Sequence, residues 1–385
     1  MKKSFADILN DVAGERGRKV ASKLPAWAGV EGLEFPSALC LEQCSSSAAA
    51  AYKASLLAGK GGSGLRVADL TGGLGVDSCA FASVAEKVAY FERNTELAAA
   101  ASRNFLKLGA GNIEAHNLEI SAENAEWLEV LRNFRPDWIF ADPARRDSAG
   151  RKVFLLEDCQ PDILTLLPVL AELTPHLMLK LSPMADLTML SSRFGAALEE
   201  IRIIGLEGEC KELLCTLDLS RSQGPGPSLH VVELGPSGGS LEFSHEDCAQ
   251  TSCGYAGPEL AGCMLLEPSA ALVKSGCLSA AGARFGLLKL DRFTHLFAAR
   301  SLPSALRPFF KTFVVEEVLP FDKASIKSLG QRYKRAEVTA RNLPLGSEAL
   351  RSRLGCKTGS DIHVFGCTAS SERVLIVARR VRDVD

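Results

Sequence analysis

Two short segments of the chain carry residues that could do chemistry, and each directly follows an apolar run. The first segment reads Asp69-Leu70-Thr71-Gly72-Gly73-Leu74-Gly75, and the second reads Asp142-Pro143-Ala144-Arg145. Glycines let a backbone approach a ligand closely, and a carboxylate at the carboxyl end of a buried strand lies where open α/β sheets bind ligands. The two segments therefore predict a bound small molecule and a reacting group held side by side.

The glycine spacing discriminates between kinds of small molecule. A dinucleotide loop reads G-x-G-x-x-G and holds a pyrophosphate, whereas here Asp69 and Thr71 precede Gly72, Gly73 and Gly75. An acid at this place suits a cationic amino group better. Glu92 ends the next expected strand about 20 residues later, where a carboxylate can bind a ribose diol. The amino-acid and ribose ends of S-adenosylmethionine fit both features, and the spacing argues against an NAD oxidoreductase.

The second segment resembles the (Asp/Asn)-Pro-Pro-aromatic loop of methyltransferases that act on exocyclic amines. Such an amine is a poor nucleophile, and a carboxylate with a backbone carbonyl can accept its two hydrogens. Here Ala144 replaces the second proline and Arg145 replaces the aromatic residue. A guanidinium can stack on a base or bind a phosphate, although two neighbouring arginines can also be a solvated surface feature. No cysteine lies near Pro143, which argues against covalent methylation of a pyrimidine carbon.

An alternative chemistry involves Lys180, which closes the expected strand 176–181. With Lys53, Asp142 and either Glu207 or Glu212, it could form the Lys-Asp-Lys-Glu set of ribose 2′-O-methyltransferases. A lysine at a strand end is more often simply solvated.

Strands and helices alternate along the first part of the chain, which predicts an α/β fold with a mostly parallel sheet. The expected strands are 66–70, 87–91, 112–116, 137–141 and 176–181, with a late pair at 201–206 and 212–219. Between them we expect helices at 77–85, 96–108, 122–132 and 161–173.

Four regions follow from this pattern: a helical N-terminal region at 1–60, the α/β domain at 61–250, a small α+β domain at 257–319, and a last unit at 320–385. The α/β domain ends in a hairpin around 229–234. The small domain has strands at 285–290, 295–298 and 312–318. The last unit has a helix at 323–333 and strands at 363–366 and 374–378.

Composition excludes several classes of protein. The chain has 385 residues, enough for more than one domain, and 46% of them are hydrophobic. No apolar run is long enough to span a membrane, and the first residues do not form a secretory signal. The 12 cysteines are scattered without a CxxC pair, which argues against a zinc site and favours free thiols in the cytoplasm.

Charge is unevenly distributed. The net charge of the whole chain is −2, but residues 320–385 contain 13 Lys/Arg and 7 Asp/Glu, a net charge of +6. Lys327, Arg332, Lys334 and Arg335 belong to this region, and we place them on or beside the expected helix as candidates for binding phosphates.

These features resemble a known group. The segment 69–77 is similar to motif I of class I S-adenosylmethionine-dependent methyltransferases. The Asp142-Pro143-Ala144-Arg145-Arg146 segment resembles the "DPARR" form of motif IV, found in bacterial proteins with a C-terminal THUMP-like domain. Segments 41–46 and 52–54 resemble that group's helix ahead of motif I, and 329–338 and 340–342 resemble its THUMP-like unit. The resemblance implies a Rossmann-like class I sheet, a helical N-terminal region and small α+β C-terminal domains, the first of them ferredoxin-like.

The resemblance also implies roles for residues. The cofactor-binding candidates are Gln43, Asp69, Thr71, Gly72, Gly73, Gly75, Glu92, Asn117 and Glu119, and the catalytic candidates are Asp142, Pro143 and Arg145. No metal is implied. The leading hypothesis is an RNA methyltransferase acting on a base amine. The alternatives are methylation of a protein or small molecule, ribose 2′-O-methylation, and a module that binds cofactor or RNA without turnover. Oligomeric state is open.

Overall fold

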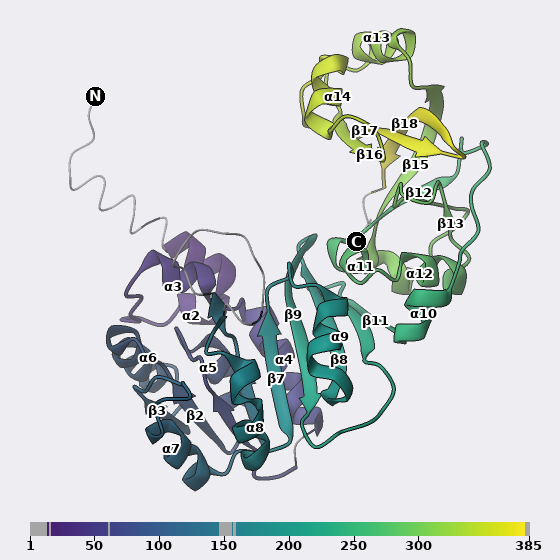
Figure 1. The fold of residues 1–385 in the computed structure, drawn as a ribbon. Helices are drawn as coiled ribbons and strands as arrows, with labels where there is room; N and C mark the ends of the chain where they lie inside the picture. The colour runs from purple at the N-terminus through teal and green to yellow at the C-terminus, as the bar shows by residue number, and fades with distance from the viewer. Residues whose placement is uncertain (1–13, 15–16, 61, 146–155, 157–158, 382–385) are drawn as a thin grey trace, which may run out of the picture. The chain divides into compact units, whose positions relative to one another are not determined.

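The computed structural model describes residues 14, 17–60, 62–145, 156 and 159–381. The chain forms two compact units, drawn in Figure 1. One comprises Met1–Ile201 and Glu212–Gly226, and the other comprises Arg202–Lys211 and Pro227–Asp385.

The first unit is built on a mostly parallel sheet, which confirms the predicted α/β fold. Its strands adjoin in the order β8-β9-β7-β4-β1-β2-β3. The strands β1, β2, β3, β4 and β7 run parallel, and β9 runs antiparallel to β7. Their bounds are β1 Arg66–Asp69, β2 Lys87–Phe91, β3 Ile113–His116, β4 Trp138–Ala141, β7 His176–Leu181, β8 Leu198–Leu206 and β9 Glu209–Asp218. Two short strands, β5 (Ala144–Arg145) and β6 (Cys159–Gln160), pair separately.

Helices lie on both faces of this sheet (Figure 1). They are α2 Pro25–Ala28, α3 Ala38–Gln43, α4 Ser47–Lys60, α5 Val76–Ala82, α6 Thr95–Lys107, α7 Glu126–Phe134, α8 Ile163–Leu173 and α9 Leu187–Phe194. Leu57 of α4 and Phe81 of α5 are fully buried against the sheet, and the Phe81 ring meets that of Phe140 edge-on at 5.1 Å. The helix α7 begins four residues later than expected, because the Asn124 side chain accepts the amide N–H of Glu126 and holds the preceding turn.

Strand order brings the two chemical segments together. The strand β1 lies between β2 and β4, and the Leu70 amide donates to the Phe140 carbonyl at 2.9 Å. The carboxyl ends of parallel strands meet at one edge of a sheet. The loops after β1, β2 and β4 therefore share one edge.

The second unit contains a seven-stranded sheet in the order β13-β14-β12-β15-β18-β17-β16. Strands β16 and β17 run parallel, and the other described pairs are antiparallel. The bounds are β12 Met264–Pro268, β13 Leu288–Lys289, β14 Phe297–Ala299, β15 Phe310–Pro320, β16 Glu337–Arg341, β17 Ile362–Ala369 and β18 Glu372–Arg380. The hairpin of β10 (Ser228–Leu234) and β11 (Gly239–Phe243) is assigned to this unit, and its strand β10 adjoins β8 at the edge of the other, nine-stranded sheet.

Apolar residues cover both faces of the seven-stranded sheet. One face packs Phe313, Phe365 and Ile376 into a core, and the other packs against α13 and α14 through Leu329 and Leu350. The helices of this unit are α10 His245–Gln250, α11 Ala270–Lys274, α12 Leu278–Phe285, α13 Lys323–Arg332 and α14 Ser347–Leu354.

Two expectations in this unit were wrong in detail. Phe285 ends α12 rather than beginning a strand, because Gly286 adopts φ +67° and terminates the helix. The helix α13 ends at Arg332, since Tyr333 is extended, so Lys334 and Arg335 do not continue its basic face. The Lys334 ammonium donates to the Gly330 carbonyl.

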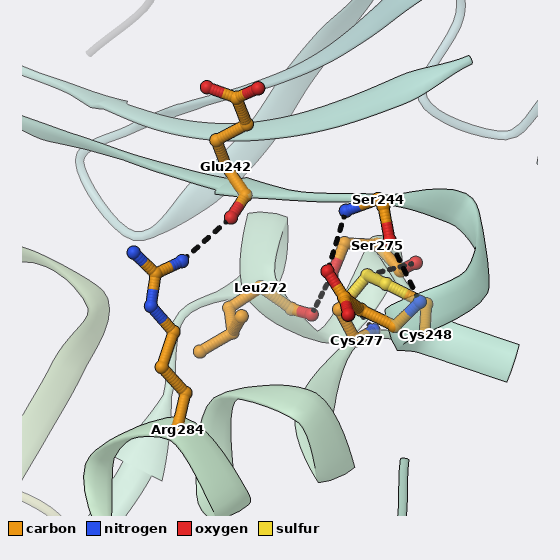
Figure 2. Close-up of a disulfide and its surroundings, with 8 residues drawn as sticks. Glu242, Ser244, Cys248, Leu272, Ser275, Cys277 and Arg284 are labelled. Carbon is orange, nitrogen blue, oxygen red and sulfur yellow. Dashed lines mark hydrogen bonds between the residues drawn. A yellow bond between two sulfur atoms is a disulfide. The ribbon is translucent and has the colours of Figure 1, made fainter. Parts of the chain in front are cut away.

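A disulfide joins Cys248 in α10 to Cys277, which precedes α12 (Figure 2). The prediction of free thiols is wrong for this pair, and the other ten cysteines are outside disulfides. Cys248 and Cys277 are 29 residues apart, and this separation did not identify them as a pair in the sequence. In the same region the Arg284 guanidinium donates to the Glu242 carbonyl at 2.8 Å.

Candidate active site

The glycines after β1 are required by packing. A Cβ at Gly72 would lie 2.0 Å from the ring of the buried Tyr90, and one at Gly75 would lie 2.4 Å from the Phe105 ring. Gly75 also has φ +84°, which side chains rarely adopt. Larger residues at these two positions would displace the loop from β2 and α6.

Gly73 differs from its neighbours, because its backbone faces open space. Its φ is +55°, and the nearest atom to an added Cβ would be the Thr71 carbonyl oxygen at 3.9 Å. The Gly73 amide donates to the Glu92 carboxylate at 2.9 Å, and the Tyr90 hydroxyl donates to the Gly73 carbonyl at 2.6 Å. The loop thus presents an unobstructed stretch of backbone beside Glu92, as close approach of a ligand requires.

Asp69 lies beneath this loop and is 1% exposed. Its carboxylate accepts the Thr71 amide at 3.0 Å and the Ser78 hydroxyl at 2.6 Å. Burial raises the pKa of Asp69 to about 7, against the lowering effect of the Ser78 hydrogen bond. Asp69 therefore shapes the loop in the structure, and its contact with a cationic amino group stays a prediction.

The remaining cofactor candidates lie at two places. The Asn117 side chain donates to the Glu92 carbonyl at 2.8 Å, so it lies directly beside the end of β2. Glu119 is exposed and pairs with Arg93 at 3.4 Å. Gln43 is exposed at the end of α3.

The second loop contacts the first directly. The Asp142 amide donates to the Thr71 hydroxyl oxygen at 2.6 Å. Pro143 is buried, and Arg145 pairs its backbone with Cys159 across β5 and β6. The Arg145 side chain lies outside the described part of the structure.

Lys180 provides a cation at this loop. Its ammonium donates to the Asp142 carboxylate, and the two side chains are 12% and 34% exposed. Burial alone would lower the pKa of Lys180, but Asp142, Asp77 and Glu212 outweigh that effect, so its pKa is raised above the ordinary value. The ammonium is therefore charged at neutral pH, and it lies beside the partly exposed Asp142 carboxylate.

A second lysine lies entirely inside the protein. Lys53 is 0% exposed, and its ammonium contacts Glu212 at 2.9 Å, Asp77 at 3.1 Å and the Ser45 hydroxyl at 2.9 Å. The Ser45 hydroxyl donates to Asp77 at 2.7 Å. Burial alone would raise the pKa of Asp77, but Lys53 and Lys180 hold it below its ordinary value. This network joins α4, α5 and β9 immediately behind the glycine loop.

The structure thus brings together Lys53, Asp142, Lys180 and Glu212. Glu212, not Glu207, is the glutamate that contacts Lys53. Four further residues that hold the site were not singled out from the sequence: Ser45, Asp77, Ser78 and Tyr90. Asp77 ends the glycine segment, so a buried acid there was the one available signal.

Two absences hold for the part of the chain that is described. No group of three or more His, Cys, Asp or Glu residues could hold a metal ion there, and no helix there is long and apolar enough to cross a membrane.

Comparison with known proteins finds relatives that span both units. Residues 310–380 match a model described as THUMP domain-like, and residues 265–305 match a ferredoxin-like domain. A crystal structure of a putative methyltransferase from Porphyromonas gingivalis W83 is 32% identical, with a TM-score of 0.83, over 96% of this chain and 89% of that one. An uncharacterized S-adenosylmethionine-dependent methyltransferase of Mycobacterium tuberculosis is 27% identical over 316 residues, which are 82% of this chain and 79% of that protein.

Proposed function

Since this chain belongs to the S-adenosylmethionine-dependent methyltransferases with ferredoxin-like and THUMP-like domains, we propose that it methylates RNA at a nucleophile held by Asp142. S-adenosylmethionine is the cofactor and supplies the methyl group. The observation that carries the proposal is the position of Asp142: its amide bonds Thr71 of the glycine loop at 2.6 Å, while its side chain stays 34% exposed. A target held there lies beside the cofactor loop.

The residues present fit this cofactor. The open backbone at Gly73 allows close approach, and Glu92 beside it offers a carboxylate to ribose hydroxyls. Asn117 is next to Glu92, on the side where we expect the adenine. Asp69 supplies negative charge below the loop for the amino group of the methionine end.

The leading acceptor is an exocyclic base amine. The Asp142 carboxylate and a backbone carbonyl of the same loop can accept its two hydrogens, and the carboxylate stabilises the positive charge that grows on nitrogen during transfer. RNA is favoured as the carrier of this amine by the match to a THUMP domain-like model and by the net charge of +6 over residues 320–385.

A ribose 2′-hydroxyl is the second candidate acceptor, and one observation favours it. Lys180 is charged and bonded to Asp142, and Lys53 and Glu212 complete the set of four residues. A cation beside a hydroxyl stabilises negative charge on its oxygen, so Lys180 suits an oxygen nucleophile better than an amine. A protein or small-molecule acceptor is the remaining alternative.

The test uses RNA from a strain that lacks the gene. The RNA is incubated with the enzyme and S-adenosylmethionine labelled in its methyl group, then digested to nucleosides. We expect the label on a base. Label in alkali-stable dinucleotides would instead identify a 2′-O-methyl group, because that group blocks cleavage of the adjoining phosphodiester. Label in the protein fraction, or no transfer at all, would contradict the RNA proposal.

We place this activity in the cytoplasm. Ten of the twelve cysteines form no disulfide, which favours a reducing compartment, whereas the bonded pair Cys248–Cys277 does not contribute to this argument.

A further inference from the structure

The sheet of the second unit curls around one of its faces. The strands β12 and β16 are separated by β15, β18 and β17, yet the Arg341 guanidinium of β16 reaches Glu267 of β12 at 2.9 Å. A flat sheet would hold these strands about 19 Å apart at the usual spacing. The ion pair therefore spans a concave surface.

This concave surface contains a pocket of about 880 Å³. Its walls come from five strands, through Glu267 of β12, Lys311 and Phe313 of β15, Arg380 of β18, His363 of β17 and Glu337 of β16. Register puts these side chains on one face: Phe313 lies opposite Arg380, and Glu337 lies opposite His363. The pocket is thus a feature of the sheet itself.

The pocket carries two cations that are available to a ligand. Lys311 and Arg380 are exposed, lie diagonally across two adjacent strands, and form no ion pair with any residue in the described ranges. Three carboxylates also line the pocket: Glu267 pairs with Arg341, Glu337 accepts the Gly359 amide at 2.7 Å, and Asp361 is exposed. The cations therefore favour an anionic ligand.

The floor between the cations suits a planar, hydrogen-bonding group. The His363 ring stacks on Phe365 with centroids 4.1 Å apart and meets Phe313 edge-on at 5.1 Å. Burial lowers the pKa of His363 to about 4, so the imidazole is neutral at physiological pH. Its Nε2 bonds the Thr339 hydroxyl at 2.7 Å. Aromatic surface with hydroxyls and a carboxylate nearby is what a nucleobase and its ribose bind.

We propose that this pocket binds a nucleotide, with its phosphate between Lys311 and Arg380 and its base or ribose against His363, Thr339 and Glu337. Arg380 can hold two phosphate oxygens at once, and Lys311 adds a point charge. The nucleotide can be free or part of an RNA strand, since both offer the same phosphate and base. The RNA form rests on the function proposed above, and it gives the THUMP-like unit a defined contact with the substrate.

The test measures binding of AMP to the full-length protein by calorimetry, with S-adenosylhomocysteine at saturation to block the cofactor site. Adenosine serves as the ligand without phosphate. Lys311→Gln and Arg380→Gln should each weaken AMP binding by about fivefold or more, because each removes a charged phosphate contact. The matched control is Arg379→Gln, the adjacent residue on the opposite face, which pairs with Glu316 at 2.8 Å. It should change the AMP affinity by less than about twofold.

Three outcomes would overturn the proposal. Adenosine could bind as tightly as AMP, or Arg379→Gln could weaken AMP binding as much as Arg380→Gln does. The third outcome is that AMP does not bind and that the Lys311→Gln and Arg380→Gln variants bind a single-stranded RNA hexamer with the affinity of the wild type. The hexamer also identifies the source of the phosphate. A hexamer that binds more tightly than AMP and is displaced by it indicates RNA, whereas tighter binding of AMP indicates a free nucleotide.

Binding is measured without methyl transfer, so failure of the pocket and failure of the proposed reaction are distinguishable. If the wild-type protein binds AMP through Arg380 but methylates no RNA, the proposed pocket stands and the proposed reaction is wrong. If the Arg380→Gln variant methylates RNA as well as the wild type does and binds the hexamer with unchanged affinity, the proposed reaction stands and the proposed pocket is wrong.

Discussion

Lys180 donates a hydrogen bond to the Asp142 carboxylate, while the amide of the same aspartate donates to Thr71 of the glycine loop. Asp142 is therefore fixed from both ends, by β7 through its side chain and by the loop after β1 through its backbone. A target that contacts the Asp142 side chain therefore also lies close to the positive charge of Lys180. This pairing raises ribose methylation from a minor alternative to the second candidate.

Lys180→Met should abolish most of the methyl transfer. It removes a charged donor from the acceptor site, a loss that typically costs about 100-fold or more in kcat. Affinity for S-adenosylhomocysteine should change by less than about threefold, because Lys180 lies on the acceptor side. Lys180→Arg keeps the charge and should retain more activity than the Met variant. Equal activity of the Met variant and the wild type would remove Lys180 from the reaction.

Lys53→Met should destabilise the first unit strongly. It leaves the carboxylates of Asp77 and Glu212 buried without their cation, which typically costs about 3–5 kcal/mol. The matched control is Lys60→Met on the same helix, whose partly exposed pair with Glu200 at 3.4 Å should contribute less than about 1 kcal/mol. Urea unfolding at neutral pH measures both. A Lys53 variant as stable as the Lys60 variant would show that the network holds no charge in the folded protein.

Gly72→Ala should disturb the cofactor loop more than Gly73→Ala. The Cβ at position 72 meets the Tyr90 ring at 2.0 Å, whereas the Cβ at position 73 meets open space. We expect Gly72→Ala to cost about 1–3 kcal/mol of unfolding free energy through overpacking. Gly73→Ala should cost about 1–2 kcal/mol for its positive φ and should weaken S-adenosylhomocysteine binding by filling the approach to the backbone. Unimpaired cofactor binding by Gly73→Ala would place the ligand elsewhere.

Cofactor affinity should depend on pH through Asp69. Its pKa of about 7 lies above the ordinary value, so without ligand the carboxyl keeps its proton below pH 7. A cationic amino group favours the carboxylate, so binding releases a proton. Affinity for S-adenosylhomocysteine should then rise by roughly fivefold to tenfold from pH 6 to pH 8. Asp69→Asn should flatten this rise, and calorimetry across the range compares the two proteins. A pH dependence that is the same in both would exclude Asp69 as its source.

The fold could be predicted from the sequence because its signals are local. The apolar runs before Asp69 and Asp142 predict strands, and parallel strands place their carboxyl ends at one edge, so the two loops had to meet. The strand β16 and the helix α14 escaped prediction. Residues Glu337–Arg341 of β16 are half-buried or exposed, and α14 has an almost wholly polar surface around Leu350 and Leu354. In neither element do apolar residues recur at the regular spacing that predicts a strand or a helix.

The contacts that complete the site are not local, and that is why the sequence left them open. Lys53 is separated from Glu212 by 159 residues, and no spacing rule links a lysine in an alanine-rich helix to a glutamate that far away. The choice between Glu207 and Glu212 needed the register of β9 on β7. In the same way, the reach of Arg341 to Glu267 depends on the curl of a sheet, which side-chain patterns do not encode.

The most direct test of the central claim is single-turnover methyl transfer to RNA by the wild type and by Asp142→Ala. Alanine keeps the backbone amide that bonds Thr71 but removes the side-chain oxygens that accept the hydrogens of the target. We predict transfer to RNA by the wild type, a rate lower by about 100-fold or more in the variant, and S-adenosylhomocysteine affinities within about twofold of each other. A variant that transfers methyl groups at the wild-type rate would contradict the account.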